Sequence, residues 1–270
     1  MQPSPASPDR IRFDQPKAGL QRLSARFGGH AYDLHRHETY AVGLTIWGAQ
    51  SFHYRGSLRT SRAGQVMIIH PDEAHDGHAG VDRGFAYRML YVDPGAVGAA
   101  LEDAPPPFVP EVVTEDPVLS ALLGEAFGDF PRPLEPLAQD AIVGRLAERL
   151  AARSDGRRLR PGPAARRAVA LARDFLDAEA HRTVASEELE RLSGLDRFAL
   201  ARHFRTVHGT SPHRYQVGRR LLEAQRLIAE GMKPAEAAAT TGFADQSHLT
   251  RHFASRFGVT PGRWATLARA

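Results

Sequence analysis

Two kinds of hydrophobic periodicity divide the chain. Between residues 20 and 94, apolar residues alternate with polar or small residues in short runs that end near glycine or proline. Alternation with a period of two predicts half-buried strands, and turns at intervals of about 8–12 residues are typical of a β-sandwich or barrel. The alternating or apolar runs lie at 40–47, 52–54, 66–69 and 85–92.

After the proline-rich stretch Ala104–Pro107 the periodicity becomes helical. It predicts helices over Pro117–Phe130 and Glu135–Ala152, the second with a clear apolar stripe. Arginine, proline and glycine gather at 157–163, which predicts a linker, and from Ala164 onward the pattern is entirely helical, with short turns.

These patterns predict an α+β multidomain protein. Residues 1–19 are rich in proline, serine and glutamine and lack periodicity, so we expect a flexible arm. Residues 20–156 are expected to form a β-barrel with helices packed on it. After the linker, residues 164–270 are expected to form an all-α domain.

One sequence pattern in the helical half occurs twice, 49 residues apart. Leu200–Tyr215 and Leu249–Trp264 both begin with Leu-x-Arg-His-Phe, share a glycine, a proline and an arginine at equal offsets, and end on an aromatic residue. Agreement at eight aligned positions indicates a duplicated supersecondary unit. Each copy follows a short helical segment and a glycine, Gly194 or Gly242, which is the order of a helix-turn-helix unit.

The second helix of each unit has a core face and a solvent face. Leu200 and Phe204, like Leu249 and Phe253, are four residues apart and are expected to pack inward. The other face is expected to enter a DNA major groove, where arginine reads guanine, glutamine reads adenine and a threonine methyl group contacts thymine. The groove-facing candidates are Arg197, Phe198, Ala201, Arg202 and Arg205 in the first helix, and Gln246, Ser247, Thr250 and Arg251 in the second.

The second helix offers four polar groups, so we expect it to discriminate more strongly between DNA sequences.

Charge supports a nucleic-acid partner. The net charge of +4 is unevenly distributed. Residues 158–270 contain 19 Lys+Arg and 11 Asp+Glu, whereas residues 1–157 contain 16 Lys+Arg and 20 Asp+Glu. Such asymmetry suggests a nucleic-acid or membrane partner for the basic half. Two alternatives to sequence-specific DNA binding stay open. The region could be a helical bundle with solvated arginines, or it could bind DNA through phosphates without sequence preference.

Composition excludes several other classes. The chain has no cysteine, which removes disulfide scaffolds, cysteine-ligated zinc fingers, iron–sulfur clusters and thiol nucleophiles. The longest mostly apolar stretch is far short of the ~18–20 residues of a membrane span, and the N-terminus lacks the apolar core of a secretory signal. We therefore expect a cytoplasmic protein with no membrane partner.

The C-terminal region resembles the AraC-type (AraC/XylS) transcriptional regulators. The stretch GFADQSHLTRHFASRFGVTPGRW, Gly242–Trp264, is close to the family signature, and the resemblance covers Arg166–Leu267. It implies two helix-turn-helix units joined by a long helix, here at about Pro212–Glu230. It also implies that residues 198, 201, 202, 246, 247, 250 and 251 occupy base-reading positions, although Ala201 is smaller than usual at its position.

The N-terminal half contains a histidine pattern. His35-Arg36-His37 precedes one predicted strand and His75 follows another. Residues 20–94 resemble the cupin-like effector domain that many AraC-type regulators carry. Cupins use an HxH pair, a later histidine and often a glutamate as a metal site, but Glu38 comes earlier than the usual carboxylate.

Three interpretations of these histidines stay open: a metal site for catalysis, an effector pocket shared with nearby aromatic residues, or hydrogen bonds that stabilise the fold. Because a sensing domain needs only to bind, we predict no catalytic residue, no cofactor and no metal. Were a metal to bind, its candidates would be His35, His37 and His75. The candidate effector-binding residues are His35, His37, Tyr40, Trp47, Tyr54, His70, His75 and Tyr87.

The sequence thus predicts a sequence-specific DNA-binding transcriptional regulator controlled by a small-molecule effector. The effector is expected to shift the arrangement of the two domains through the linker. The expected partners are double-stranded DNA, the effector, a second copy of the chain that docks with the help of the helices at 117–152, and RNA polymerase. The alternative is a cupin-type metal-dependent enzyme with a helical appendage.

Overall fold

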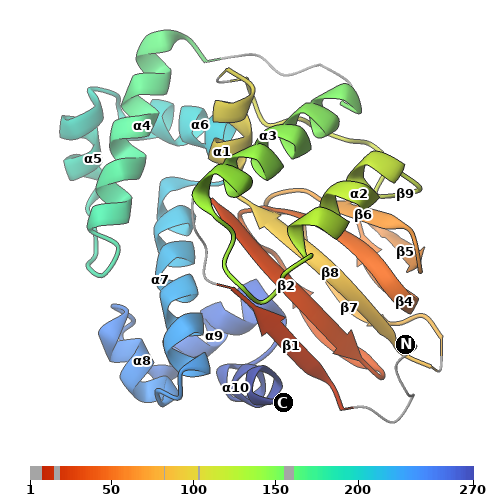
Figure 1. The fold of residues 1–270 in the computed structure, drawn as a ribbon. Coiled ribbons are helices and arrows are strands. Elements are labelled where there is room, and N and C mark those ends of the chain that lie inside the picture. The colour runs from red at the N-terminus through yellow and green to blue at the C-terminus, as the bar shows by residue number, and fades with distance from the viewer. Residues whose placement is uncertain (1–7, 15–18, 82, 103, 155–160) are drawn as a thin grey trace.

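The computed structural model describes residues 8–14, 19–81, 83–102, 104–154 and 161–270. The strands lie on one side of the molecule and two groups of helices on the other, with α7 running between those groups (Figure 1). The strands are β1 (Arg10–Phe13), β2 (Leu20–Phe27), β3 (His30–His35), β4 (Tyr40–Tyr54), β5 (Ser57–Arg62), β6 (Val66–Ile69), β7 (His75–Ala79), β8 (Phe85–Val92) and β9 (Val113–Thr114). The helices are α1 (Pro94–Ala100), α2 (Pro117–Ala126), α3 (Pro136–Ala152), α4 (Pro163–Ala178), α5 (Ser186–Ser193), α6 (Arg197–His208), α7 (Pro212–Ala229), α8 (Pro234–Thr240), α9 (Gln246–Phe257) and α10 (Pro261–Arg269).

The long strand β4 belongs to two sheets. Its first part pairs with β8 and β6, within the order β1-β2-β8-β4-β6-β9. Its last part, from Ala49, pairs with β5 and β7, and β7 pairs with β3. The described strands therefore form a jelly-roll-like pair of sheets joined by β4, which confirms the cupin-like fold that the sequence predicted, although the sheet does not close into a barrel.

A glycine makes the bend in β4 possible. Gly48 has a φ of 69° and lies next to the register shift between Thr45 and Trp47. A Cβ atom at Gly48 would lie 2.0 Å from the carbonyl oxygen of Gly84. Only glycine allows both this backbone conformation and this close approach, so Gly48 sets the point where β4 passes from one sheet to the other.

A layer of helices covers one face of the larger sheet. Leu20, Val42 and Leu90 from the strands share a buried cluster with Leu122 of α2 and Leu146 of α3. Asp116 caps α2 by accepting hydrogen bonds from the N–H groups of Val118 and Leu119. The helical periodicity of the sequence predicted both helices, which begin at or within one residue of the expected positions and differ by up to four residues at their ends.

The two helical groups differ in how they are buried. The first, α4 to α6, has its own apolar cluster, which includes Leu176, Leu200 and Phe204. The second, α8 to α10, shares one cluster with the interior of the sheets, so that Phe253 and Trp264 belong to the same core as the strand residues. The second helix-turn-helix unit is thus packed directly on the N-terminal domain.

Two features of the predicted organisation differ from the structure or lie outside it. The segment expected to be a flexible arm contains β1, which pairs with β2, and Phe13 of β1 packs on Trp264 with ring centroids 4.9 Å apart. Most of the expected linker, at 157–160, lies outside the described residues, and α4 already begins at Pro163.

Within the part of the chain that is described, no helix is both long and apolar enough to cross a bilayer.

Candidate functional site

Short polar caps and glycines define α6 and α9. Asp196 accepts hydrogen bonds from two N–H groups at the start of α6, and Asp245 accepts one from the N–H of His248 in α9. Each helix ends at a glycine in the left-handed conformation, Gly209 with a φ of 70° and Gly258 with a φ of 67°. Such a cap-to-glycine frame is a strong local signal for helix boundaries, and both helices lie where the repeat predicted the second helix of each unit.

The two faces of these helices are separated as the repeat predicted. Leu200 and Phe204 in α6, and Leu249 and Phe253 in α9, are buried, with exposed fractions of 2% or less. The groove-facing candidates lie on the accessible side. Arg197, Phe198, Arg202, Arg205, Gln246, Ser247 and Arg251 are exposed, and Ala201 and Thr250 are half-buried.

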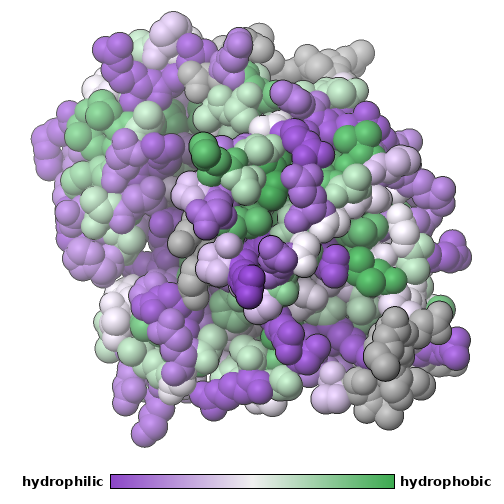
Figure 2. Space-filling model, viewed as in Figure 1, coloured by the Kyte–Doolittle hydropathy of each residue, from purple (hydrophilic) through white to green (hydrophobic). Residues whose placement is uncertain are grey.

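Phe198 is unusual because an aromatic side chain on the first turn of α6 is 68% exposed. The guanidinium of Arg197 lies 5.4 Å from its ring centroid. In the view of Figure 2, hydrophilic side chains cover much of the helical part of the molecule, with apolar residues scattered among them. An exposed aromatic ring beside arginines is suited to contact bases and phosphates of a duplex.

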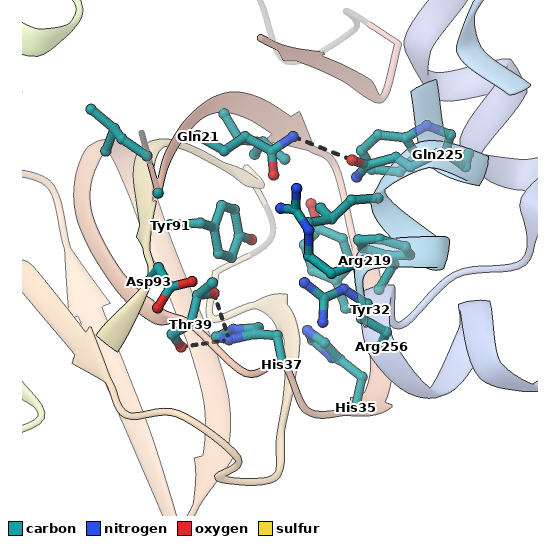
Figure 3. A pocket seen from close by; sticks show the side chains of 16 residues that line it. Gln21, Tyr32, His35, His37, Thr39, Tyr91, Asp93, Arg219, Gln225 and Arg256 are labelled. Carbon is teal, nitrogen blue, oxygen red and sulfur yellow. Dashed lines mark hydrogen bonds between the residues drawn. The ribbon is translucent and has the colours of Figure 1, made fainter. Parts of the chain in front are cut away.

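A pocket lies between the N-terminal domain and the second helical group (Figure 3). Strands and loops of the first domain supply one wall, and α7, α9 and α10 supply the other. Gln21 of β2 donates a hydrogen bond across the pocket to Gln225 of α7, at 3.2 Å. The lining residues are Gly19, Leu20, Gln21, Leu23, Tyr32, His35, His37, Thr39, Tyr91, Asp93, Arg219, Leu222, Gln225, Arg256, Phe257 and Trp264.

A buried arginine lines the pocket. Arg256 of α9 is 6% exposed and forms an ion pair with Glu38, the residue after the HxH pair. Burial lowers the pKa of Arg256 to about 9, so its guanidinium is still charged at neutral pH. Its Nε has no hydrogen-bond partner among the described residues. A buried charged donor without a partner is costly, and an anionic group in the pocket would satisfy it.

Main-chain hydrogen bonds hold the HxH segment against the end of α9. The N–H of Asp33 donates to the carbonyl of Gly258 at 2.8 Å, and the N–H of Arg36 donates to that of Ser255 at 3.0 Å. Farther along the interface, Arg214 of α7 forms an ion pair with Asp72. The sensing half and the second reading helix therefore share a continuous interface.

The first helical group also contacts the N-terminal domain, through α1. Nδ1 of His208, at the end of α6, lies 3.7 Å from Oδ1 of Asp93, the N-cap of α1. Burial opposes ionisation of Asp93, but His208 and the N–H of Gly95 outweigh it and hold the pKa of this carboxyl below its usual range. Both reading helices thus have a direct connection to the sensing half.

The structure brings together some of the effector-binding candidates. His35 and His37 line the interdomain pocket, and His35, His75 and Tyr87 line a smaller cavity between the two sheets. Burial lowers the pKa of all three histidines below the ordinary value, that of His75 to about 4. Burial raises the pKa of the Tyr87 hydroxyl, which forms a hydrogen bond with the hydroxyl of Tyr32.

Four other candidates lie elsewhere. His70 contacts Tyr54 through Nδ1 and accepts from the N–H of Val109 through Nε2, and the hydroxyl of Tyr40 donates to the carbonyl of Pro107. These three side chains hold strands to the segment that follows α1. Trp47 is half-buried beneath the guanidinium of Arg26, 5.1 Å from the ring centroid. None of the four lines the interdomain pocket.

Sequence reasoning did not find the pocket residues of the helical half. Arg219, Gln225, Arg256 and Trp264 come from α7, α9 and α10, and pairing them with the histidines requires knowledge of the domain interface. One signal was available for Arg256. At the repeat offset it corresponds to Val207, so a charge replaces an apolar residue on the core side of the duplicated helix. Such a break in an otherwise similar repeat indicates a specific role.

Comparisons with known proteins agree with this arrangement. Residues 17–147 match the family model described as an AraC-like ligand binding domain, and residues 189–266 match a helix-turn-helix domain. The uncharacterized HTH-type transcriptional regulator YbfI of Bacillus subtilis is 26% identical over 83% of this chain and 84% of its own length. The virulence regulon transcriptional activator VirF of Yersinia enterocolitica is 39% identical over 22% of each chain.

Solved structures of ToxT from Vibrio cholerae have the same fold. One covers 93% of this chain and 99% of its own, with a TM-score of 0.66 at 10% identity. Such a likeness covers both the sheet-rich half and the helical half. The two family models together span most of the sequence, and the chain belongs to the AraC family of helix-turn-helix transcriptional regulators, with the ligand-binding domain of that family at its N-terminal end.

Proposed function

We propose that this regulator binds a small-molecule effector in the interdomain pocket and thereby controls how α6 and α9 engage DNA. The observation that carries the proposal is the composition of the pocket, to which both domains contribute side chains. A ligand seated there touches the sensing strands and the helix that bears Arg256. It can therefore favour one arrangement of the domains by the difference in its affinity for the two.

The proposed DNA-reading surface consists of the exposed faces of α6 and α9. The two helices would enter successive major grooves about one turn apart, as α7 joins their units. Reading by α9 is expected to give more sequence discrimination, because Gln246 and Arg251 can each make bidentate contacts to a base. The proposed contact residues are Arg197, Phe198, Ala201, Arg202, Arg205, Gln246, Ser247, Thr250 and Arg251.

The chemistry of the pocket favours an apolar acid as effector. Arg219 and Arg256 supply guanidinium donors, which are paired with Asp177 and Glu38 respectively, and Leu222, Phe257 and Trp264 supply an apolar wall. Arginine binds a carboxylate through two parallel hydrogen bonds. Two of the similar ToxT structures were solved with an unsaturated fatty acid and with (E)-4-(8-methylnaphthalen-1-yl)but-3-enoic acid, both of them apolar carboxylic acids.

The remaining partners are proposals of the same kind. A homodimer, formed with the help of α2 and α3, would present two pairs of reading helices to a repeated operator. RNA polymerase would be contacted by the DNA-bound protein, and the cytoplasm is the compartment that suits these roles. The matching curated relatives are regulators, so we favour a binding protein over a metal-dependent enzyme.

A direct test uses oleate as the probe. An operator is first selected from a random duplex library, and its affinity is then measured by fluorescence anisotropy with and without oleate. Oleate is expected to change the affinity, and oleyl alcohol, which lacks the carboxylate, is expected to have no effect. Arg219→Ala should weaken the response to oleate, whereas Arg145→Ala on α3 should leave it unchanged. Equal responses to the acid and the alcohol would exclude a carboxylate-specific site.

A further inference from the structure

Arg220 lies on α7, the helix that joins the two helix-turn-helix units, and it is 9% exposed. Its guanidinium donates hydrogen bonds to three main-chain carbonyls. Nε donates to Ala180 at 2.5 Å and Nη2 to Arg182 at 2.6 Å, both in the loop between α4 and α5. Nη1 donates at 2.9 Å to Gly242, in the turn between α8 and α9. One buried side chain therefore ties the first unit to the second.

The backbones of the two units also meet at this point. Gly242 has a φ of 79°, and a Cβ atom there would lie 2.1 Å from the carbonyl oxygen of His181. Glycine alone permits this conformation and this approach. Gly242 comes three residues before Asp245, the cap of α9. The contact between the units is thus next to the start of the second reading helix.

The loop between α4 and α5 is itself fixed to the first unit. Arg182 forms ion pairs at 2.7 Å with Glu179, at the end of α4, and with Glu188 of α5. Gln216, one turn before Arg220 on α7, donates to the carbonyls of Glu179 and Arg182 at 3.1 and 2.8 Å. A displacement of this loop would therefore carry the first unit with it.

Arginine is suited to this position by its shape. Its guanidinium is planar and presents five N–H donors in fixed directions, so it can bond three acceptors only when they occupy matching places. All three acceptors of Arg220 are main-chain groups, so the hydrogen bonds depend on where the two backbones lie. Separation of the units would leave buried donors unpaired, which is costly.

We propose that Arg220 is a positioning residue that fixes the distance and orientation between α6 and α9. It would thereby restrict the regulator to operators with one spacing between the two base segments. The inference rests on the proposed function, in which both helices bind one duplex. One added base pair moves a segment by about 3.4 Å along the duplex and about 35° around it. A rigid pair of helices cannot follow that change, whereas a loosened pair can.

The first test varies the spacing in the selected operator. One base pair is inserted or deleted between the segments read by α6 and α9. The unmodified chain is expected to lose about 10-fold or more in affinity on each altered operator, as one helix then faces wrong bases. Arg220→Met keeps the length of the side chain but removes the donors. It should bind all three spacings within about 3-fold of one another, because a looser connection lets each unit find its segment.

Arg226→Met is the matched control. Arg226 is also an arginine of α7, but it pairs with Glu223 and Glu230 of the same helix. Its loss should leave the preference for one spacing unchanged. Arg220→Lys keeps the charge but lacks the planar fork. It should show an intermediate preference, and it tests the same contact if Arg220→Met does not fold.

The second test uses no DNA. The chain has no cysteine, so Arg205→Cys on α6 and Ser247→Cys on α9, both at exposed positions, place two spin labels without background. Pulsed electron paramagnetic resonance should give one narrow distance distribution in the doubly labelled chain. Arg220→Met in the same background should broaden it, and Arg226→Met should not.

A role in stability alone would weaken binding equally on all three spacings and leave the preference intact. That result, or an unchanged distance distribution in the folded Arg220 variants, would overturn the proposal. An unmodified chain that binds all three spacings equally would overturn it as well. Selection of no preferred operator would instead count against the proposed function, and the distance measurement would still decide whether Arg220 fixes the two helices.

Discussion

The backbone N–H of Arg36 donates a hydrogen bond to the carbonyl oxygen of Ser255, at 3.0 Å, and joins the HxH segment of the sensing domain to α9. Two residues farther along, Glu38 forms an ion pair with Arg256 on the same helix. The side chains of Arg256 and Glu38 are 6% and 18% exposed. A reading helix is thus held at its C-terminal end by the domain that senses the effector.

We expect Glu38→Gln to loosen this connection. The substitution leaves the buried guanidinium of Arg256 without its carboxylate. Removing one charge of a buried ion pair is destabilising, because the other charge stays buried without compensation. Amide exchange at Asp33 and Arg36 should become about 10-fold faster, which corresponds to about 1.4 kcal/mol. Hydrogen exchange read by mass spectrometry or NMR measures the change.

Glu73→Gln is the control for the Glu38 prediction. Glu73 is paired with Arg55 at 3.0 Å on an exposed part of the same domain, and its side chain is 39% exposed. Exposed pairs contribute little to stability, so exchange at Arg36 should not change. Unaltered exchange in Glu38→Gln itself would show that the two main-chain hydrogen bonds hold the interface without the ion pair.

Local patterns made much of the fold predictable. Asp245 and Gly258 are a capping side chain and a left-handed glycine, and both act within one helical turn, so local sequence is enough to set the ends of α9. The repeat likewise predicted that Leu249 and Phe253 are buried. Signals of this kind depend only on the chain near each residue.

The pocket and the pairing of the outer strands depend on contacts between distant residues. Gln21 meets Gln225 across 204 positions of sequence, and no local periodicity reports such a pair. For the same reason β1 was missed, since its four residues gain their order from β2 and from Trp264. Tyr40 and His70 have the same spacing and polarity as pocket residues, but they face the segment after α1 instead.

Arg251→Ala tests whether α9 reads bases. If the exposed guanidinium contacts a base edge, the affinity for the selected operator should fall by about 1–3 kcal/mol while binding to random DNA changes little. Anisotropy titrations at one fixed salt concentration compare the two duplexes, because phosphate contacts are strongly salt-dependent. Arg145→Ala on α3 removes an equal charge outside the reading helices and should have no effect. Equal weakening on both duplexes would identify Arg251 as a phosphate contact.

Leu249→Ala tests the assignment of the buried face of α9. The side chain is fully buried, at 0% exposure. Truncation should lower the free energy of unfolding by about 2–5 kcal/mol through lost burial and the cavity left behind. Denaturant titration followed by tryptophan fluorescence is suitable, because Trp264 is in the same apolar cluster. Ser247→Ala, two residues earlier on the exposed face, should change stability by less than about 0.5 kcal/mol.

Gly48→Ala tests the bend in β4. Alanine is strained at a φ of 69°, and its Cβ would lie 2.0 Å from the carbonyl oxygen of Gly84. A loss of about 3 kcal/mol or more is expected from backbone strain and overpacking together. Gly124→Ala on α2 should instead stabilise the protein by about 0.5–1 kcal/mol, because no atom lies within 4 Å of its Cβ. Thermal unfolding of the two variants should therefore shift in opposite directions.

Asp116 should make stability depend on acid pH. Burial opposes its ionisation, but the N–H of Leu119 and the guanidinium of Arg149 outweigh burial and hold the pKa of Asp116 below its ordinary value. A carboxyl with a lowered folded-state pKa stabilises the protein above its unfolded-state value, about 3.9, and loses that contribution as the pH falls through the folded-state value. Asp116→Asn retains an acceptor for the cap of α2 but loses the charge that pairs with Arg149 and Arg153. It should lower the free energy of unfolding by about 1–3 kcal/mol at pH 7. It should also flatten the fall in stability below about pH 4, because the titrating carboxyl is gone. Asp116→Ala should cost about 1 kcal/mol more, because the cap is lost as well. Urea unfolding at a series of pH values measures both effects, and an identical acid profile in Asp116→Asn would contradict the assignment.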